Sequence, residues 1–234
     1  MVSPQSLRAI VFDLDGTLVD SAPDIAGAIN TVLAESGRRM LSLAEVRGMV
    51  GDGTRALVER AFATADGRPA ADRAALSPYI ERYRAVYEAR ATDETLPYPG
   101  ALEALRTLDA AGTRMGLCTN KPDRPAHAIL SAFGLSPFIR AVVGGDSAPA
   151  RKPDPRHLAA VLDLLGTRPD QAVMVGDGSN DVLVARALSV PVVLVSFGYS
   201  RSDPGTLGAD AVIDRFERLP EALARFEKSR GSIP

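Results

Sequence analysis

Short runs of apolar and β-branched residues recur along the chain and predict the strands of a buried sheet. Six segments carry such runs, namely 8–12, 113–118, 139–143, 171–175, 191–195 and 211–213. The intervening segments place apolar residues at helical spacing, which predicts helices over 100–111, 123–133, 155–165, 179–188 and 217–228. Strands that alternate with helices of about 10–15 residues are typical of an α/β fold with a doubly wound parallel sheet.

Residues 20–96 break this alternation. The stretch contains no convincing strand, carries helical spacing instead, and is too long for a plain loop. We therefore expect a helical domain inserted after the first strand, with two prolines in 96–100 marking the return to the sheet because proline resists helix continuation. The predicted division is a core domain of residues 1–19 and 97–234 and a helical cap domain of residues 20–96.

The composition narrows the class of protein further. A chain of 234 residues with 46% hydrophobic and 24% charged residues can bury a sizeable core without a disulfide or metal staple. The formal net charge of −2 and the absence of a basic run argue against nucleic acid and anionic membranes as partners. The N-terminal segment resembles neither a signal peptide nor a membrane span, so we expect a cytoplasmic protein. The single cysteine, Cys118, excludes an intrachain disulfide and is expected to fill apolar space.

Acidic residues follow two of the predicted strands. Asp13 and Asp15 come directly after the first strand, and Asp177 and Asp181 follow the fourth at the start of a helix. In an open α/β sheet ligands bind beyond the carboxyl ends of the strands, so these four side chains are expected to meet. Two like charges 4 Å apart cost about 4 kcal/mol at an effective dielectric constant near 20, and a bound cation relieves that cost. Oxygen ligands with room for water suit Mg²⁺.

Two further strand ends carry groups that suit an anionic ligand. The second strand is followed by Thr119 and Asn120, whose hydroxyl and amide can donate to a phosphate oxygen, although a plain polar loop explains them equally well. Lys152 lies in a loop that Pro153 and Pro155 restrict. Such a lysine is commonly a solvated charge, but here it could reach the acidic cluster and offset its charge.

Four segments resemble, in order and spacing, the four sequence motifs of the haloacid dehalogenase superfamily. They are the segments that carry Asp13, Thr119, Lys152 and Asp177. The first motif, residues 13–21, is the most specific, and the helical insert is similar to the superfamily's α-helical cap. The resemblance implies a Rossmann-like α/β core and covers nearly the whole chain. Further segments are similar to phosphoglycolate phosphatases, namely Val50–Gly53, Tyr98–Gly100, Cys118–Pro122, Gly144–Ser147 and Gly208–Ile213.

The resemblance also implies roles for individual residues. Asp13 would be the nucleophile that forms an aspartyl-phosphate, and Asp15 the general acid and then the base for water. Thr119, with Asn120 beside it, and Lys152 would bind the phosphoryl group. The Mg²⁺ ion would be held by Asp13, the backbone carbonyl of Asp15 and Asp177, with Asp181 ligating or close by. One position departs from the pattern, because Gly178 follows Asp177 where phosphoglycolate phosphatases usually carry Ser or Thr.

The expected reaction is therefore Mg²⁺-dependent hydrolysis of a small phosphate monoester, with 2-phosphoglycolate as the substrate that the resemblance favours. A carboxylate is already ionised at pH 7 and needs no activating base to attack phosphorus. In the insert, Gly53 and Arg55 are expected to bind the leaving group, because glycine lets backbone N–H groups approach a carboxylate and a guanidinium pairs with it. A plain helix start near Gly53 is the competing interpretation.

Several alternatives share these motifs. A haloacid dehalogenase would not need Asp15 as a general acid, whereas a sugar-phosphate phosphatase or an enzyme like β-phosphoglucomutase would use both aspartates. A non-enzymatic phospho-receiver module also combines an aspartate cluster with a lysine, but it would not need a cap of this size. The expected partner is a small phosphorylated metabolite, with no nucleic acid and no membrane, and the expected state is a monomer or homodimer.

Overall fold

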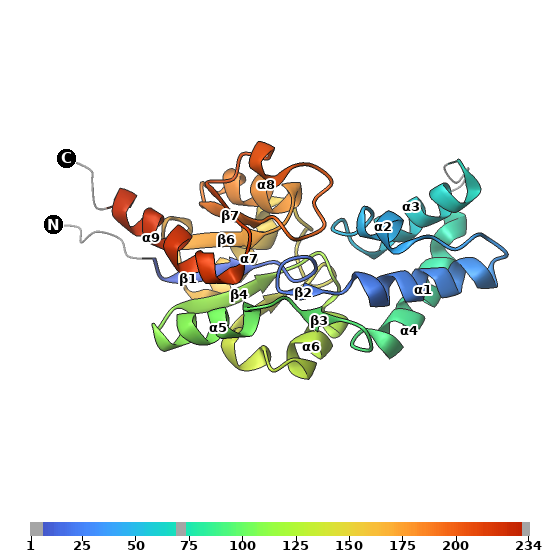
Figure 1. Ribbon diagram of the computed structural model, residues 1–234, viewed down its shortest axis with the longest axis horizontal. Coiled ribbons are helices and arrows are strands. Elements are labelled where there is room, and N and C mark those ends of the chain that lie inside the picture. The colour runs from blue at the N-terminus through green and yellow to red at the C-terminus, as the bar shows by residue number, and fades with distance from the viewer. Residues whose placement is uncertain (1–6, 69–73, 231–234) are drawn as a thin grey trace.

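A computed structural model describes residues 7–68 and 74–230, and its centre is a parallel sheet in the order β5-β4-β1-β6-β7-β8 (Figure 1). The strands are β1 (Ala9–Phe12), β4 (Arg114–Cys118), β5 (Ala141–Val143), β6 (Ala172–Gly176), β7 (Val192–Val195) and β8 (Ala211–Ile213). Each lies within one of the six segments that the apolar runs predict, apart from one residue at the end of β6. The predicted doubly wound α/β fold is confirmed.

Helices cover both faces of this sheet because its strands are apolar on both sides. Ile10 and Phe12 of β1 pack into one core cluster with helices α5, α6 and α9, whereas Ala9 and Val11 pack into another with α7 and α8. Strands that are buried on both faces read as continuous apolar runs, which explains the pattern in the sequence. The helices are α5 (Ala101–Ala110), α6 (Asp123–Ala132), α7 (Pro155–Leu165), α8 (Ser179–Ala187) and α9 (Leu219–Arg230).

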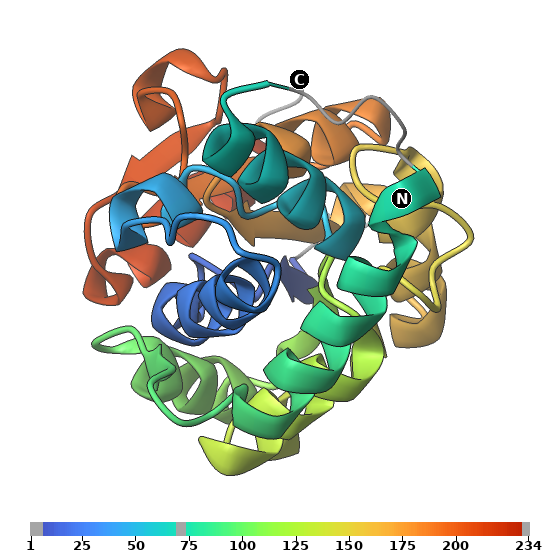
Figure 2. The same ribbon diagram turned by 90° about the vertical axis from the view of Figure 1, so that its right-hand side faces the viewer.

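The inserted segment forms a separate layer of helices beyond the carboxyl ends of the strands (Figures 1 and 2). These helices bury an apolar cluster of their own, to which Ile29, Phe62 and Tyr83 contribute. They are α1 (Ala22–Glu35), α2 (Leu43–Arg47), α3 (Thr54–Asp66) and α4 (Ser77–Arg90). We call this layer the cap; the exact division of the chain at residues 20 and 96 stays a prediction.

Two short strands join the cap to the core. β2 (Val19–Asp20) pairs antiparallel with β3 (Leu96–Pro97), so both chain crossings lie side by side. Asp24 of α1 is fully buried and accepts hydrogen bonds from the backbone N–H groups of Glu94 and Thr95, which fastens the two ends of the cap together. Short 3₁₀ turns complete the described chain at Ala74–Leu76, Ser136–Phe138, Pro169–Gln171, Pro204–Thr206 and Phe216–Arg218.

The described residues contain no helix with the length and apolar character that crossing a membrane requires.

Candidate active site

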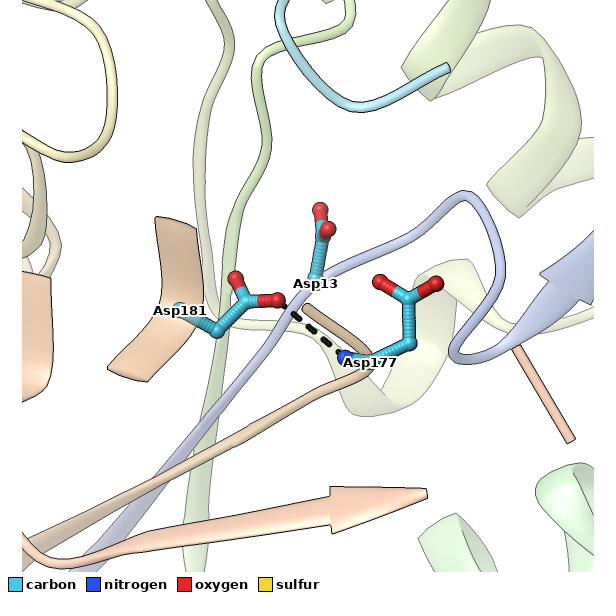
Figure 3. Close-up of side chains that lie close together, drawn as sticks. All are labelled: Asp13, Asp177 and Asp181. Carbon is cyan, nitrogen blue, oxygen red and sulfur yellow. Dashed lines mark hydrogen bonds between the residues drawn. The ribbon is translucent and has the colours of Figure 1, made fainter. Parts of the chain in front are cut away.

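Three aspartates converge where β1 and β6 end (Figure 3). Asp13 follows β1, Asp177 follows β6, and Asp181 lies in the first turn of α8. One carboxylate oxygen from each lies within 4.8 Å of the others. The parallel pairing of β1 with β6 causes this convergence, because the Asp13 N–H donates to Val175 O at 2.9 Å and so aligns the two strand ends.

The aspartate cluster carries an excess of buried negative charge. Burial, together with the charges of Asp181 and Asp15, raises the pKa of Asp13 to about 6 even though Lys152 lowers it. Burial, together with the charges of Asp181 and Asp13, raises the pKa of Asp177 well above its ordinary value. A nearby cation lowers the pKa of a carboxyl group, so a bound cation would oppose both of these shifts.

Lys152 supplies one buried positive charge to this cluster. Its Nζ lies 3.0 Å from Asp13 Oδ1 and 2.7 Å from Asp181 Oδ1. Burial alone would lower the pKa of Lys152, but the two carboxylates outweigh it and raise that pKa above its ordinary value. The loop is held by His157, whose Nδ1 accepts a hydrogen bond from the Lys152 backbone N–H at 3.1 Å. Burial lowers the pKa of His157 to about 4, so the ring is neutral near pH 7 and can accept that bond.

Asp181 shapes the turn before α8 in addition to binding Lys152. Its Oδ2 accepts hydrogen bonds from the backbone N–H groups of Asp177 and Gly178, each at 3.1 Å (Figure 3 shows the first). Gly16 contributes the space that Asp177 occupies, because it has a φ of 81° and a Cβ there would collide with the Asp177 carboxylate. The glycine of the first motif is therefore required by both its backbone conformation and the close approach of Asp177.

The side chain of Asp15 lies apart from the three-aspartate cluster. Its oxygens accept hydrogen bonds from Lys121 Nζ at 2.8 and 3.1 Å and from the Ser21 hydroxyl at 2.5 Å. Asp13 and Asp15 nevertheless line the same pocket, which encloses about 290 Å³ between the core and the cap. Asp15 is thus placed beside Asp13 in the lining of that pocket.

Thr119 and Asn120 both line this pocket, but their side chains differ in what they can offer a ligand. Asn120 Nδ2 donates to Gly51 O at 2.9 Å and to Lys152 O at 3.0 Å, so both amide hydrogens are already used. The prediction that this amide donates to phosphate is therefore wrong for this conformation. Asn120 instead ties the cap to the loop that carries Lys152, whereas the buried Thr119 hydroxyl stays suited to a phosphoryl oxygen.

The cap loop of residues 51–53 closes over the site and is fastened to the core. Gly51 O accepts a second hydrogen bond from Asn180 Nδ2 at 3.2 Å, and Asp52 Oδ1 accepts one from the same amide at 2.6 Å. Asp52 Oδ2 lies 3.2 Å from Arg201 Nη2 of the core. Gly53 lines the pocket and immediately precedes α3, with a φ of 83°. The helix start that was the competing interpretation is therefore present, and binding of the leaving group by Gly53 stays a prediction.

Arg55 does not reach the pocket, contrary to the sequence-based expectation. Thr54 and Leu57 are the residues of α3 that line it, and Arg55 lies on a different face of that helix. The Arg55 guanidinium is half exposed and lies 3.9 Å from Glu59, one helical turn further along. The rotation of α3 about its own axis decides which of its residues face the pocket. The sequence does not define this rotation near the start of a helix.

The chain is similar to known proteins over most of its length. A family model described as haloacid dehalogenase-like hydrolase matches residues 7–188. The chain belongs to the haloacid dehalogenase-like hydrolases. It is 49% identical over 213 residues to a phosphoglycolate phosphatase of Caulobacter vibrioides, covering 91% of this chain and 89% of that one. It is also 48% identical over 218 residues to a phosphoglycolate phosphatase of Rhodospirillum rubrum, covering 92% and 90%.

A solved structure agrees with the fold of this hydrolase over nearly the whole chain. The protein, described as a predicted phosphoglycolate phosphatase from Haemophilus somnus 129pt, superposes with a TM-score of 0.86 at 29% identity and covers 92% of this chain and 97% of its own. The family resemblance read from the four motifs is confirmed, and so is the fold class that it implied.

The Mg²⁺ site that the family implies fits the residues of this hydrolase. The donor set consists of hard carboxylate oxygens, and three buried carboxylates face the single buried charge of Lys152. Of the four predicted ligands, Asp181 already uses both oxygens, and the Asp15 carboxylate is taken by Lys121 and Ser21. Asp13 and Asp177 are therefore the side chains best suited to hold the ion.

Several of the pocket residues of this hydrolase were not singled out from the sequence, among them Lys121, Tyr83 and Tyr87. Lys121 is buried and pairs with Asp15, and Tyr83 and Tyr87 of α4 line the pocket with parallel rings. Lys121 directly follows Thr119 and Asn120 at a strand end, which is a signal that could have been read. The two tyrosines are four residues apart and so share a helix face, but nothing local indicates that this face meets the core.

Proposed function

We propose that this hydrolase is a Mg²⁺-dependent phosphatase that cleaves 2-phosphoglycolate to glycolate and phosphate through an aspartyl-phosphate on Asp13. The observation that carries the proposal is that buried Asp13 lies beside Lys152 and Asp177 and lines, together with Asp15, a pocket between the core and the cap. The choice of substrate is supported by relatives that are named phosphoglycolate phosphatases. Their similarity extends over about nine tenths of the chain.

In the first step an Asp13 carboxylate oxygen attacks phosphorus, and the bond from phosphorus to the leaving-group oxygen breaks. Protonated Asp15 gives its proton to that oxygen, which leaves as a hydroxyl group. Lys152, held 3.0 Å from Asp13, offsets the negative charge that gathers as two anions approach. The Thr119 hydroxyl, buried at the same strand end as Asn120, donates to a phosphoryl oxygen.

In the second step water attacks phosphorus, and the bond between phosphorus and the Asp13 oxygen breaks. Asp15, now ionised, takes the proton from that water, so the enzyme returns to its starting state with inorganic phosphate as the product. The cap excludes other water during the first step, since its 51–53 loop is hydrogen-bonded to the core.

Mg²⁺ would be held by Asp13, Asp177 and the backbone carbonyl of Asp15, where it would supply charge neutralisation for the phosphoryl group.

A hydrolysis screen with 2-phosphoglycolate, sugar phosphates, nucleotides and pyrophosphate tests this proposal. We expect phosphate release from 2-phosphoglycolate to exceed that from the other compounds, to need Mg²⁺, and to be inhibited by Ca²⁺. Ca²⁺ accepts more ligands at longer distances and would misplace the nucleophile. Full activity in excess EDTA would contradict the requirement for Mg²⁺. A preference for a sugar phosphate would contradict the proposed substrate.

Asp177→Asn is expected to stabilise the metal-free protein at pH 7.5 by about 1 kcal/mol, or roughly 2–4 °C in Tm. The raised pKa means that the folded state binds a proton more tightly than the unfolded state, so the contribution of Asp177 to stability falls as pH rises above about 4. The gain should therefore shrink at pH 4. Asn keeps an acceptor for the Tyr199 N–H, which donates to Asp177 Oδ2 at 2.6 Å.

The same variant should lose the increase in Tm that Mg²⁺ gives the wild type, together with most of the activity. Asp163→Asn is the matched control, because Asp163 is exposed on α7 and its loss should change stability by less than about 0.5 kcal/mol at either pH. Thermal unfolding at both pH values, with and without Mg²⁺, provides the measurement. An Asp177→Asn protein that is less stable than the wild type at pH 7.5 without metal would show that Asp177 serves the fold.

A further inference from the structure

The pocket is lined mainly by polar residues on the side of the core, its floor, and mainly by apolar residues on the side of the cap, its roof. Its floor carries Asp13, Asp15 and Thr119 of the core, and its roof carries Ile25, Leu57 and Tyr87 of the cap. The phosphoryl group belongs at the floor, so the leaving group must lie between Asp15 and the cap. The residues at that level decide which leaving groups are accepted.

Lys121 places a buried positive charge at this level. Its side chain is 3% exposed, and its Nζ lies 2.8 Å from Asp15 Oδ1 and 4.6 Å from the centre of the Tyr87 ring. Lys121 therefore contacts Asp15, the proposed general acid, on one side and the Tyr87 ring of the cap on the other. It borders the space that the leaving group would occupy.

Tyr87 adds a hydroxyl that the described residues leave without a partner. The residue is 4% exposed, lines the pocket, and its hydroxyl makes no hydrogen bond within residues 7–68 and 74–230. A buried hydroxyl without a partner costs about 1–3 kcal/mol, and phenylalanine would fill the same space without that cost. An acceptor oxygen on a bound ligand would satisfy this group.

The start of α3 gives a third source of positive potential. Gly53 and Thr54 line the pocket, and no side chain caps the first turn of this 13-residue helix. Backbone N–H groups at a helix start favour an anion.

We propose that Lys121 and Tyr87, aided by the start of α3, bind the carboxylate of the leaving group. The inference rests on the proposed function and specifies its substrate class. The substrates are phosphate esters of short hydroxycarboxylic acids. In 2-phosphoglycolate a single CH₂ group separates the ester oxygen from the carboxylate carbon. A leaving-group oxygen next to Asp15 therefore brings the carboxylate to the cation that already contacts Asp15. Lys121 takes the role that the sequence suggested for Arg55.

The test compares 2-phosphoglycolate with its amide, 2-phosphoglycolamide, which keeps the CH₂–O–phosphate group and removes the negative charge. Because both leaving groups are alcohols, loss of help from Asp15 should affect both rates, and the ratio of the two kcat/KM values isolates carboxylate binding. We expect Lys121→Met to lower that ratio roughly 10–150-fold, as for a charge-assisted hydrogen bond, and Tyr87→Phe to lower it roughly 2–10-fold. Tyr79→Phe, on the same helix but packed against Phe62, should leave the ratio unchanged.

Equal losses on both substrates in Lys121→Met and Tyr87→Phe would overturn the inference, because Lys121 would then serve Asp15 alone and Tyr87 the fold. In that case wild-type turnover of 2-phosphoglycolate would still support the proposed function. A wild type that does not hydrolyse 2-phosphoglycolate would contradict the proposed function and overturn the inference with it. Tyr87→Phe removes one unpartnered atom, so it keeps the test decisive if Lys121→Met does not fold.

Discussion

Asp13→Asn is expected to lower kcat for phosphate release by about 10⁴-fold or more, because it removes the atom that forms the bond to phosphorus. An amide is a far weaker nucleophile than a carboxylate, and the other carboxylate on Lys152, that of Asp181, already uses both of its oxygens within the protein. The fold should survive, since Asn retains an oxygen for the Leu14 N–H that now donates to Asp13 at 2.7 Å. Steady-state kinetics and thermal unfolding measure the two effects separately.

Chemical trapping makes this prediction more specific. Acid-quenched wild type should contain a phosphate that hydroxylamine releases, as expected for an acyl phosphate, and Asp13→Asn should contain none. Asp163→Asn, an exposed substitution of the same kind, should retain full activity and the trapped phosphate. An Asp13→Asn enzyme with more than a tenth of the wild-type activity would refute the role of Asp13 as the nucleophile.

Much of this site could be predicted from the sequence because it depends on strand ends. Asp13 and Asp177 each follow an apolar run, and parallel strands bring their carboxyl ends to one edge of the sheet. Once β1 and β6 are neighbours, the acidic cluster follows without further information. Lys152 follows less directly, since its loop is positioned through the buried His157, which joins the Lys152 backbone N–H to Val143 O of β5.

The cap side of the site could not be predicted in the same way. Tyr87 meets Lys121 only because α4 packs across the pocket, and the two residues belong to different layers of the molecule. The local pattern shows which face of a cap helix is apolar but not which residues of the core it meets. Arg55 shows the same limit, because one residue of helix rotation separates a pocket residue such as Thr54 from an exposed one.

Asn120 illustrates a different limit. Its residue type was recognised as a donor, and the structure confirms that it donates, but to Gly51 and Lys152 rather than to a ligand. A side chain's hydrogen-bond capacity can be read from the sequence, whereas its partners depend on tertiary contacts.

Lys152→Met is expected to have the second largest effect, on activity and on stability together. The substitution keeps much of the side-chain volume but leaves Asp13 and Asp181 buried without their shared cation. Removing one partner of a buried ion pair costs about 3–5 kcal/mol, so a clear fall in Tm should accompany a loss of kcat of about 10³-fold or more. The loss of stability should be smaller at pH 5 than at pH 7.5, because a proton on Asp13 then replaces the missing charge.

The double variant Lys152→Met with Asp181→Asn separates the two effects. Asn at 181 removes the stranded charge and keeps an oxygen for the Asp177 and Gly178 N–H groups, so most of the lost stability should return. Activity should not return, because the phosphoryl group still lacks its lysine. Arg156→Ala serves as the control, since Arg156 is an exposed cation near Lys152 that pairs with Asp154. If the double variant recovered both stability and activity, Lys152 would act through the fold alone, and the charge that offsets the attack of Asp13 would have to come from elsewhere.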